Sequence, residues 1–380
     1  MPHSSDVLTD HLPHGDGLVA YALLQHLAER GHSVHVATQR QAICGVVPAN
    51  LHLYTVPQTR TGMAGRLQYM LGMRRLFRTL SKTIKFDLLH QTNPVFSGVS
   101  LALVDSPLPL VLGTYVASWG KDPNTMTGGD GAMTRLVRAG RDMLAAVQQA
   151  RASMLLLTGP TACERLPWAR SVAGKIRYLP HGVDTQMFAP AVDAAETGLR
   201  ALFLSNVSLR KGVLPLVRSW AIVLQQMPAA RLMVVGDGPD LAAMQRLAAE
   251  LGVAHAIDFA GSVEHNAVPA VMQRYALYVL PSFGEPYAGS LLEAMSCGLP
   301  VVYTLAGGLP DMVPAGGGVG VAMDDPEALA AAMLTLLRDA ALRQQMGRIN
   351  RAAMLATMTW PRVVETLEDY YAELLVGVRP

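Results

Sequence analysis

The sequence is short of cysteine and of charged residues. Its 380 residues include three cysteines, and only 16% of them are charged. Cys44, Cys163 and Cys297 stand far apart, with neither the paired spacing of a disulfide framework nor the close spacing of metal ligands. Because isolated cysteines are usual in a reducing compartment, a cytoplasmic protein is expected.

Long apolar runs and a strong net charge are also missing. No run approaches the roughly 20 residues that span a bilayer. The first residues, Met1 to Asp6, lack the basic start and apolar core of a secretory signal. A formal net charge of +2 is too small to indicate a nucleic-acid partner.

Apolar residues in alternating patterns make up much of the chain. With 51% hydrophobic residues, a well-buried globular protein is expected, and the length predicts two or three domains. In both halves, short apolar runs typical of strands alternate with segments of helical period. Examples are residues 18–30, followed by a strand over 34–38, and a strand over 199–204, followed by a helix to 227. This alternation predicts α/β domains built on doubly wound sheets.

The most informative stretch runs from Leu280 to Val302. It predicts a short strand, a loop, a helix over 291–296 capped by Ser290, and a second strand. Glu285 lies in the loop, and Glu293 lies in a helix whose other residues are Leu, Ala, Met and Cys. A carboxylate in such surroundings needs hydrogen-bond donors, and sugar hydroxyls would serve. For an isolated pair, solvated carboxylates are the commoner explanation.

This stretch resembles the E-x7-E signature of the retaining glycosyltransferases of family 4, which have the GT-B fold. The match consists of Glu285-Pro-Tyr-Ala-Gly-Ser-Leu-Leu-Glu293 followed by Ala-Met-Ser-Cys-Gly-Leu-Pro-Val-Val. The resemblance extends over nearly all of the chain. It implies two Rossmann-like doubly wound domains with an interdomain cleft. It also implies retaining transfer of a sugar from a nucleotide-diphosphate sugar to a hydroxyl acceptor, which is a glycan, a lipid or a small molecule.

The resemblance and the local chemistry together nominate a donor site. Lys211 stands at the start of a predicted helix, where its ammonium and the helix dipole both attract phosphate oxygens. With Arg210 it is assigned to the diphosphate, while Glu285 accepts from the donor sugar and Glu293 from the ribose. The other residues assigned to the donor are Gly15, Gly17, Asn206, Val263, Tyr287, Ala288, Gly289, Ser290 and Leu291. Asp16 and Tyr115 are assigned to the acceptor, and neither a metal nor a cofactor is expected.

The same resemblance sets the expected domain limits. An N-terminal acceptor domain is expected over 1–180, a linker over 181–198 and a donor domain over 199–360. A last helix over 361–380 is expected to pack back onto the first domain.

Two departures from the family pattern keep alternatives open. Tyr115 occupies the place where many relatives have a histidine, and Asn206 lies where an arginine is usual. A subunit or sensor that binds a nucleotide sugar without transferring it is therefore the alternative. A dehydrogenase is a third interpretation, weakened because the chain has no complete G-x-G-x-x-G followed by an acid.

A basic segment over 60–85 suggests a further partner. It contains no acidic residue and predicts a helix with an apolar stripe beside a basic one. The apolar stripe is Met63, Leu67, Met70, Phe77, Leu80 and Ile84, and the basic one is Arg74, Arg78, Lys82 and Lys85. Such a helix can lie on an anionic membrane, although a core helix with a solvated face is the more frequent explanation.

Overall fold

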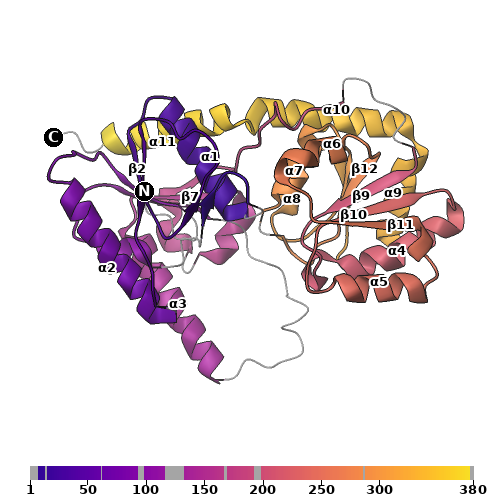
Figure 1. Cartoon of the computed structure of the whole chain (residues 1–380), viewed down its shortest axis with the longest axis horizontal. Helices are drawn as coiled ribbons and strands as arrows, with labels where there is room; N and C mark the ends of the chain where they lie inside the picture. Colours follow the sequence, from indigo (N-terminus) through magenta and orange to yellow (C-terminus); the bar gives the residue numbers. More distant parts are fainter. Residues whose placement is uncertain are drawn as a thin grey trace. The chain divides into compact units, whose positions relative to one another are not determined.

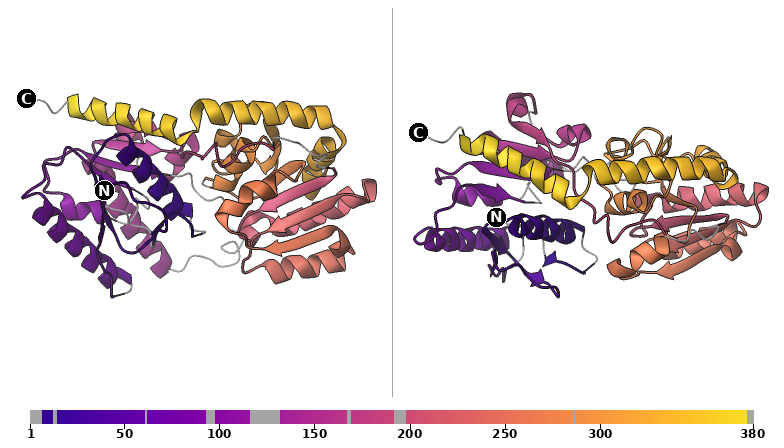
Figure 2. Two further views of the ribbon diagram at one scale, coloured as in Figure 1. Left: turned by 45° about the horizontal axis from the view of Figure 1, so that its top comes forward. Right: turned by 90° about the horizontal axis from the view of Figure 1, so that it is seen from above.

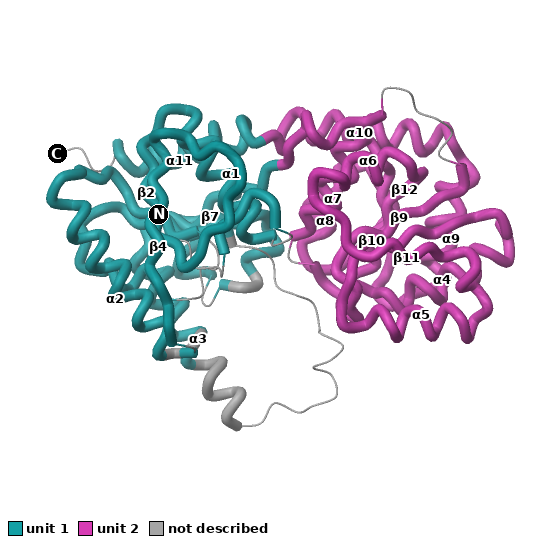
Figure 3. Tube along the Cα trace, in the orientation of Figure 1, with its two compact units in different colours: residues 1–116, 130–182, 360–380 teal, residues 117–129, 183–359 magenta. Residues whose placement is uncertain are grey.

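The computed structural model describes residues 7–12, 15–60, 62–92, 98–115, 132–166, 169–191, 198–285 and 287–376. These residues form two compact units (Figure 3). The first unit combines the described residues up to 115, those from 132 to 182, and those from 360 onward. The second unit takes in those between 183 and 359.

The second unit is built on one six-stranded sheet. In sheet order its strands are β11 (Ile257–Gly261), β10 (Arg231–Val235), β9 (Arg200–Leu204), β12 (Leu277–Leu280), β13 (Val301–Thr304) and β14 (Gly318–Val321). Every pairing between neighbours is parallel. This is the strand order of a Rossmann sheet, with the order reversing between β9 and β12. The predicted doubly wound architecture is therefore confirmed for this unit.

Helices cover both faces of this sheet. Its longer helices are α4 (Val213–Gln226), α5 (Leu241–Glu250), α7 (Gly289–Ser296), α9 (Pro326–Arg338) and α10 (Ala340–Thr357), and its short ones are α6 (Val268–Met272) and α8 (Leu309–Met312). Helix α4 contacts both α5 and α9, while α7 contacts α10, and Figure 1 shows α4 and α5 across the sheet from α7 and α8. All four residues of β12 and all four of β13 are buried, as expected for strands covered on both sides.

The first unit is also α/β, with parallel pairings throughout its described strands. Strand β1 (Leu8–Thr9) pairs with β3 (Gln41–Ala42), and β2 (Val34–Thr38) pairs with β4 (Leu51–Thr55). A four-stranded sheet contains β5 (Leu89–Gln91), β6 (Leu110–Tyr115), β7 (Met154–Leu157) and β8 (Ile176–Tyr178). The helices of this unit are α1 (Gly15–Glu29), α2 (Gly62–Leu80), α3 (Ala132–Arg151) and α11 (Trp360–Val376). Short 3-10 turns cover Val99–Leu103, Pro160–Arg165 and Ala169–Lys175.

The last helix, α11, packs on the first unit. Its buried residues recur at helical spacing, namely Trp360, Val363, Val364, Leu367 and Tyr371, and they belong to the same apolar cluster as the buried face of α1. Figure 2 shows α11 running beside α1. Glu368 of α11 bonds both Arg30 and His32, which follow α1. The chain therefore returns to its first unit after residue 359.

Helix α2 packs only part of its predicted apolar stripe against the core, namely Met70 and Phe77. Tyr69 and Met73 are its buried large side chains, and the Tyr69 hydroxyl donates to Ala37 O at 2.8 Å. Leu67, a member of the predicted apolar stripe, is 57% exposed. The buried side chain in this part of the helix is instead Tyr69, which the predicted stripe did not include. Among the described residues, no helix has both the length and the apolar character that crossing a membrane requires.

Candidate active site

Two loops meet where the strand order of the second unit reverses. One follows β9 and runs to Gly212, and the other follows β12 and runs to the start of α7. The Phe283 amide donates to Arg210 O at 2.9 Å. Gly212 has a φ of 74°, and a Cβ there would lie 1.8 Å from Pro281 O, so only glycine permits this approach. Ligands of open α/β sheets bind at such a reversal, outside the carboxyl ends of the strands.

A buried ion pair joins the two loops. The Lys211 ammonium contacts Glu285 Oε2, with the two side chains only 13% and 5% exposed. Burial raises the pKa of Glu285, and the charges of Lys211 and Arg210 oppose that rise. The Ser282 hydroxyl lies 3.5 Å from the same carboxylate oxygen. The pair fixes the Lys211 ammonium at the point where the two loops meet.

The backbone of Glu285 is held from a third loop, which follows β13. Glu285 forms an isolated parallel bridge with Gly307, and the Gly308 amide donates to Glu285 O at 2.8 Å. A Cβ at Gly307 would lie 2.5 Å from Glu285 O, and the φ of this residue is 59°. The glycine therefore allows the two loops to touch and sets where the carboxylate lies.

Helix α7 starts beside this ion pair in the sequence. Its first residues, Gly289 and Ser290, have backbone N–H groups without an intrahelical acceptor, as at every helix start. Gly289 is exposed, and a Cβ there would have no atom within 4 Å. Ser290 was expected to cap the helix, but that expectation was wrong: the N-cap is Ala288, and Ser290 Oγ lies 2.8 Å from Tyr278 Oη. The helix start is thus open, positive in character and suited to an anion.

The second glutamate of the motif has a partner that the sequence did not reveal. His265 Nε2 donates to Glu293 Oε1 at 2.8 Å, and the side chains are 31% and 16% exposed. The hydrogen bond from His265 to Glu293 raises the pKa of the histidine, against the effect of burial. The His265 ring also lies 5.4 Å from that of Phe188, measured between centroids.

The remaining donor residues divide into surface and core positions. Asn206 is exposed in the loop after β9. Val263 and Tyr287 are half-buried against the apolar core. Ala288 and Leu291 are buried in that core, so the Leu291 side chain has no route to a ligand.

Four predicted residues belong to the first unit. Gly15, Asp16 and Gly17 form the first turn of α1, with Asp16 exposed and Gly17 buried. Tyr115 ends β6, and its side chain lies outside the described part of the structure. The contacts described above bring Lys211, Arg210 and Glu285 together within the second unit, and the start of α7 follows Glu285 closely in the sequence.

Two polar residues of this region escaped the sequence reasoning. His265 lies 28 positions from Glu293, in a turn whose sequence carries no motif. The buried hydroxyl of Ser208 makes no hydrogen bond within the part of the chain that is described, although it lies just before Arg210. Buried polar atoms usually have partners, so this hydroxyl is a candidate ligand contact.

Comparison with known proteins identifies the family. A family model described as Glycosyltransferase Family 4 matches residues 14–187, and one described as Glycosyl transferases group 1 matches residues 198–339. The chain is 23% identical to the N-acetyl-alpha-D-glucosaminyl L-malate synthase of Bacillus anthracis, over 95% of this chain and 94% of that protein.

Solved structures show the same fold. The sucrose-phosphate synthase of Thermosynechococcus elongatus superposes with a TM-score of 0.79 at 22% identity, covering 99% of this chain and all of that one. HepE of Anabaena, solved in complex with UDP, superposes with a TM-score of 0.76 at 17% identity, covering 98% of each chain. The chain therefore belongs to the glycosyltransferases, with a family 4 domain in its first half and a group 1 domain in its second, and it has the GT-B fold.

Proposed function

We propose that this glycosyltransferase takes its sugar from a nucleotide-diphosphate donor and transfers it with retention to a hydroxyl acceptor. The observation that carries the proposal is the buried Lys211–Glu285 ion pair at the strand-order reversal, followed by the open start of α7. The UDP complex of HepE supports the choice of donor class.

The chemical step breaks the bond between the anomeric carbon and the diphosphate oxygen. Negative charge then grows on the departing diphosphate and must be met by donors that are already in place. Lys211 and Arg210 supply positive charge, and the amides of Gly289 and Ser290 supply N–H donors at a helix start. We propose that these groups do this work without a divalent metal, so transfer should persist in the presence of EDTA.

The two glutamates would hold the sugars. Glu285 keeps one oxygen on Lys211, which is assigned to the diphosphate, so the glutamate is assigned to hydroxyls of the adjoining donor sugar. Glu293 shares one oxygen with His265 and is assigned to the ribose. In retaining transfer by front-face attack within an ion pair, the sugar cation forms beside its leaving group, and no protein nucleophile is needed.

The test uses neutral replacements of similar size. Lys211→Met and Glu285→Gln should each lower turnover at least about tenfold, equivalent to about 1.4 kcal/mol of lost transition-state stabilisation. Each single change removes the opposite charge from one buried charged group, which costs stability. The double variant leaves no unpaired charge, so it should fold nearly as stably as the parent and still fail to transfer. Arg218→Ala, at an exposed position of α4, is the control.

The assay should separate binding from transfer. A thermal-shift screen with UDP, GDP and ADP identifies the base, because a ligand at about 100 times its dissociation constant adds about 2.7 kcal/mol. Normal turnover in the double variant would reject the site. Nucleotide-sugar binding without product, across glycan, lipid and small-molecule acceptors, would favour the non-catalytic alternative.

We also propose that residues 60–85 contact anionic membranes. The outward face of α2 presents two exposed leucines, Leu67 and Leu71, followed by Arg75 and, just beyond the helix, Lys82. Arg74, in contrast, bonds Asp105 at 2.5 Å and Ala102 O at 3.0 Å within the protein. A row of leucines followed by basic groups suits an interface with acidic lipids.

Flotation with liposomes tests this contact. Reversing the charge of Arg75 and Lys82 to glutamate should weaken binding to phosphatidylglycerol liposomes at least about tenfold, since each basic residue near such a surface contributes about 1 kcal/mol. Reversal of Arg218 and Arg246, exposed in the second unit, gives the same net charge and should have no effect. Equal losses in both variants would show that only overall charge matters.

A further inference from the structure

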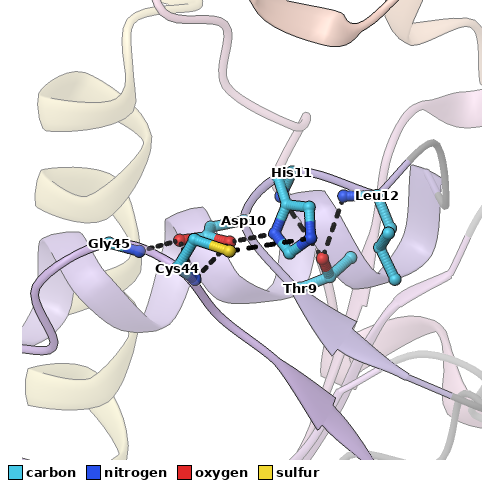
Figure 4. Close-up of polar contacts among 6 residues, drawn as sticks. All are labelled: Thr9, Asp10, His11, Leu12, Cys44 and Gly45. Carbon is cyan, nitrogen blue, oxygen red and sulfur yellow. Dashed lines mark hydrogen bonds and ion pairs between the residues drawn. The ribbon is translucent and has the colours of Figure 1, made fainter.

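A cluster of nucleophilic and titratable side chains lies in the first unit, apart from the donor site. It contains Asp10 and His11, which follow β1, and Cys44 and Gly45, which follow β3 (Figure 4). The two strands pair in parallel, Thr9 with Ala42, so the residues after them emerge at the same edge. Cys44 is exposed and the His11 side chain is 43% exposed, so small molecules can reach both.

The Asp10 carboxylate is fixed by backbone amides. The Cys44 amide donates to it at 3.1 Å and the Gly45 amide donates to Oδ2 at 2.6 Å. A Cβ at position 45 would lie 3.0 Å from Oδ2, so glycine leaves room for the carboxylate. Burial opposes the charge of Asp10, but the hydrogen bonds from His11 and these amides outweigh it and lower the pKa of the carboxyl.

A continuous polar chain links this carboxylate to the thiol. Asp10 Oδ1 lies 2.7 Å from His11 Nδ1, and His11 Nε2 lies 3.8 Å from Cys44 Sγ. The Thr9 hydroxyl accepts from the His11 and Leu12 amides at 3.3 and 3.0 Å and so fixes the turn that carries the histidine. Because the carboxylate accepts the proton on Nδ1, Nε2 is the free acceptor and faces the sulfur.

We infer that Cys44 is a thiol modification site, activated by His11 and Asp10, that forms mixed disulfides with low-molecular-weight disulfides. His11 Nε2 takes the thiol proton, and the thiolate attacks one sulfur of the small disulfide. A new sulfur–sulfur bond forms as the old one breaks, and the departing thiolate takes the proton from His11. The exchange is balanced: Cys44 is oxidised, one half of the disulfide is reduced, and no other reactant is needed.

The geometry of this cluster suits thiol–disulfide exchange better than it suits metal binding. Ligand atoms of Asp10, His11 and Cys44 lie within 4.8 Å of one another. However, Asp10 is engaged with Nδ1 and with two amides, which leaves only Nε2 and Sγ facing each other, whereas zinc sites use three or four protein ligands. The nearby Tyr21 of α1 does not compete as a base, since burial and the charges of Asp10 and Glu29 raise the pKa of its phenol.

The other two cysteines of the chain serve as internal controls for the reactivity of Cys44. Cys163 is half-buried, and its sulfur lies 3.9 Å from the Tyr178 hydroxyl rather than near an imidazole. Cys297 is buried. Full-length protein is therefore incubated with glutathione disulfide, and peptide mass spectrometry follows the rate at each cysteine. Near pH 7, Cys44 should react at least about tenfold faster than Cys163, a threshold set below the roughly 100- to 10,000-fold that a positioned base contributes.

Two variants, each measured at two pH values, distinguish deprotonation of Cys44 by His11 from mere solvent exposure of the thiol. His11→Gln should lower the rate of mixed-disulfide formation at Cys44 at least about tenfold near pH 7. Asp10→Asn should lower this rate less, since Asp10 is a positioning residue. Near pH 10, well above the ordinary thiol pKa of about 8.5, both variants should match the parent. Equal rates in parent and His11→Gln at pH 7 would overturn the inference, as would a deficit that persists at pH 10.

Discussion

The protonation of His265 depends on its hydrogen bond to Glu293. The histidine donates to the carboxylate and is itself partly buried, so two opposite effects act on its charge. The hydrogen bond favours imidazolium, and burial disfavours it. In the native chain the first effect is larger, and the pKa of His265 is raised.

Replacing Glu293 by glutamine should reverse that balance. Without the carboxylate only burial acts strongly, so the pKa of His265 should fall below the ordinary value of about 6.5. Proton NMR titration of the imidazole measures this directly. His255→Gln, in an exposed turn of the same unit, helps assign the signals.

The same pair has a defined effect on stability. A group with a raised folded pKa contributes stability that is fully present below its unfolded pKa and is lost as pH rises through the folded value. The stability difference between parent and Glu293→Gln should therefore be larger near pH 5.5 than near pH 8.5. A difference that grows with pH would contradict the pairing.

At the scale of elements, a buried histidine links β5 to α11. His90 Nε2 donates to Gly113 O at 3.0 Å, and Nδ1 accepts from the Tyr371 hydroxyl at 2.6 Å. Both contacts use the neutral ring, and burial lowers the pKa of His90 to about 4. Protonation would place a hydrogen on Nδ1 and break the bond from α11.

The stability of the first unit should therefore decrease at acid pH. A histidine with a depressed folded pKa destabilises as pH falls from its unfolded value of about 6.5 toward about 4. At pH 4.5 the expected loss from His90 alone is about 2 to 3 kcal/mol. Hydrogen exchange in peptides of β5 to β8 measures it. His90→Gln, which can keep both hydrogen bonds without titrating, should lose most of this acid dependence, and an unchanged dependence would exclude His90 as its source.

Elements of the second unit could be predicted because their signals are local. Strands β12 and β13 are continuous apolar runs bounded by proline and glycine, and the helix between them was expected at 291–296 and observed at Gly289–Ser296. The contacts that make the site are not local. Lys211 meets Glu285 across 74 positions, and His265 meets Glu293 across 28. The resemblance supplied Lys211 and both glutamates, but no pattern in the sequence signalled His265.

At the scale of the whole molecule, the consecutive helices α10 and α11 belong to different units. Helix α10 buries Asn350, whose side-chain amide donates to Leu299 O and Gly317 O at 2.7 Å, next to the end of α7. Helix α11 starts three residues later and buries Trp360 and Leu367 in the cluster of the first unit. The two helices should therefore report separately on the stability of their units.

A bound nucleotide should stabilise α10 without stabilising α11. If the donor site lies at Lys211 and the start of α7, UDP or another nucleotide diphosphate at about 100 times its dissociation constant stabilises the second unit by about 2.7 kcal/mol. Hydrogen exchange should then slow in α7 and in the protected core of α10, while α11 exchanges as before. The Lys211→Met/Glu285→Gln protein with the same nucleotide is the control and should show no protection. Protection of α11 equal to that of α10 would mean that nucleotide binding stabilises both units together. Binding energy would then reach, by coupled unfolding, a helix whose buried side chains belong to the cluster of the first unit.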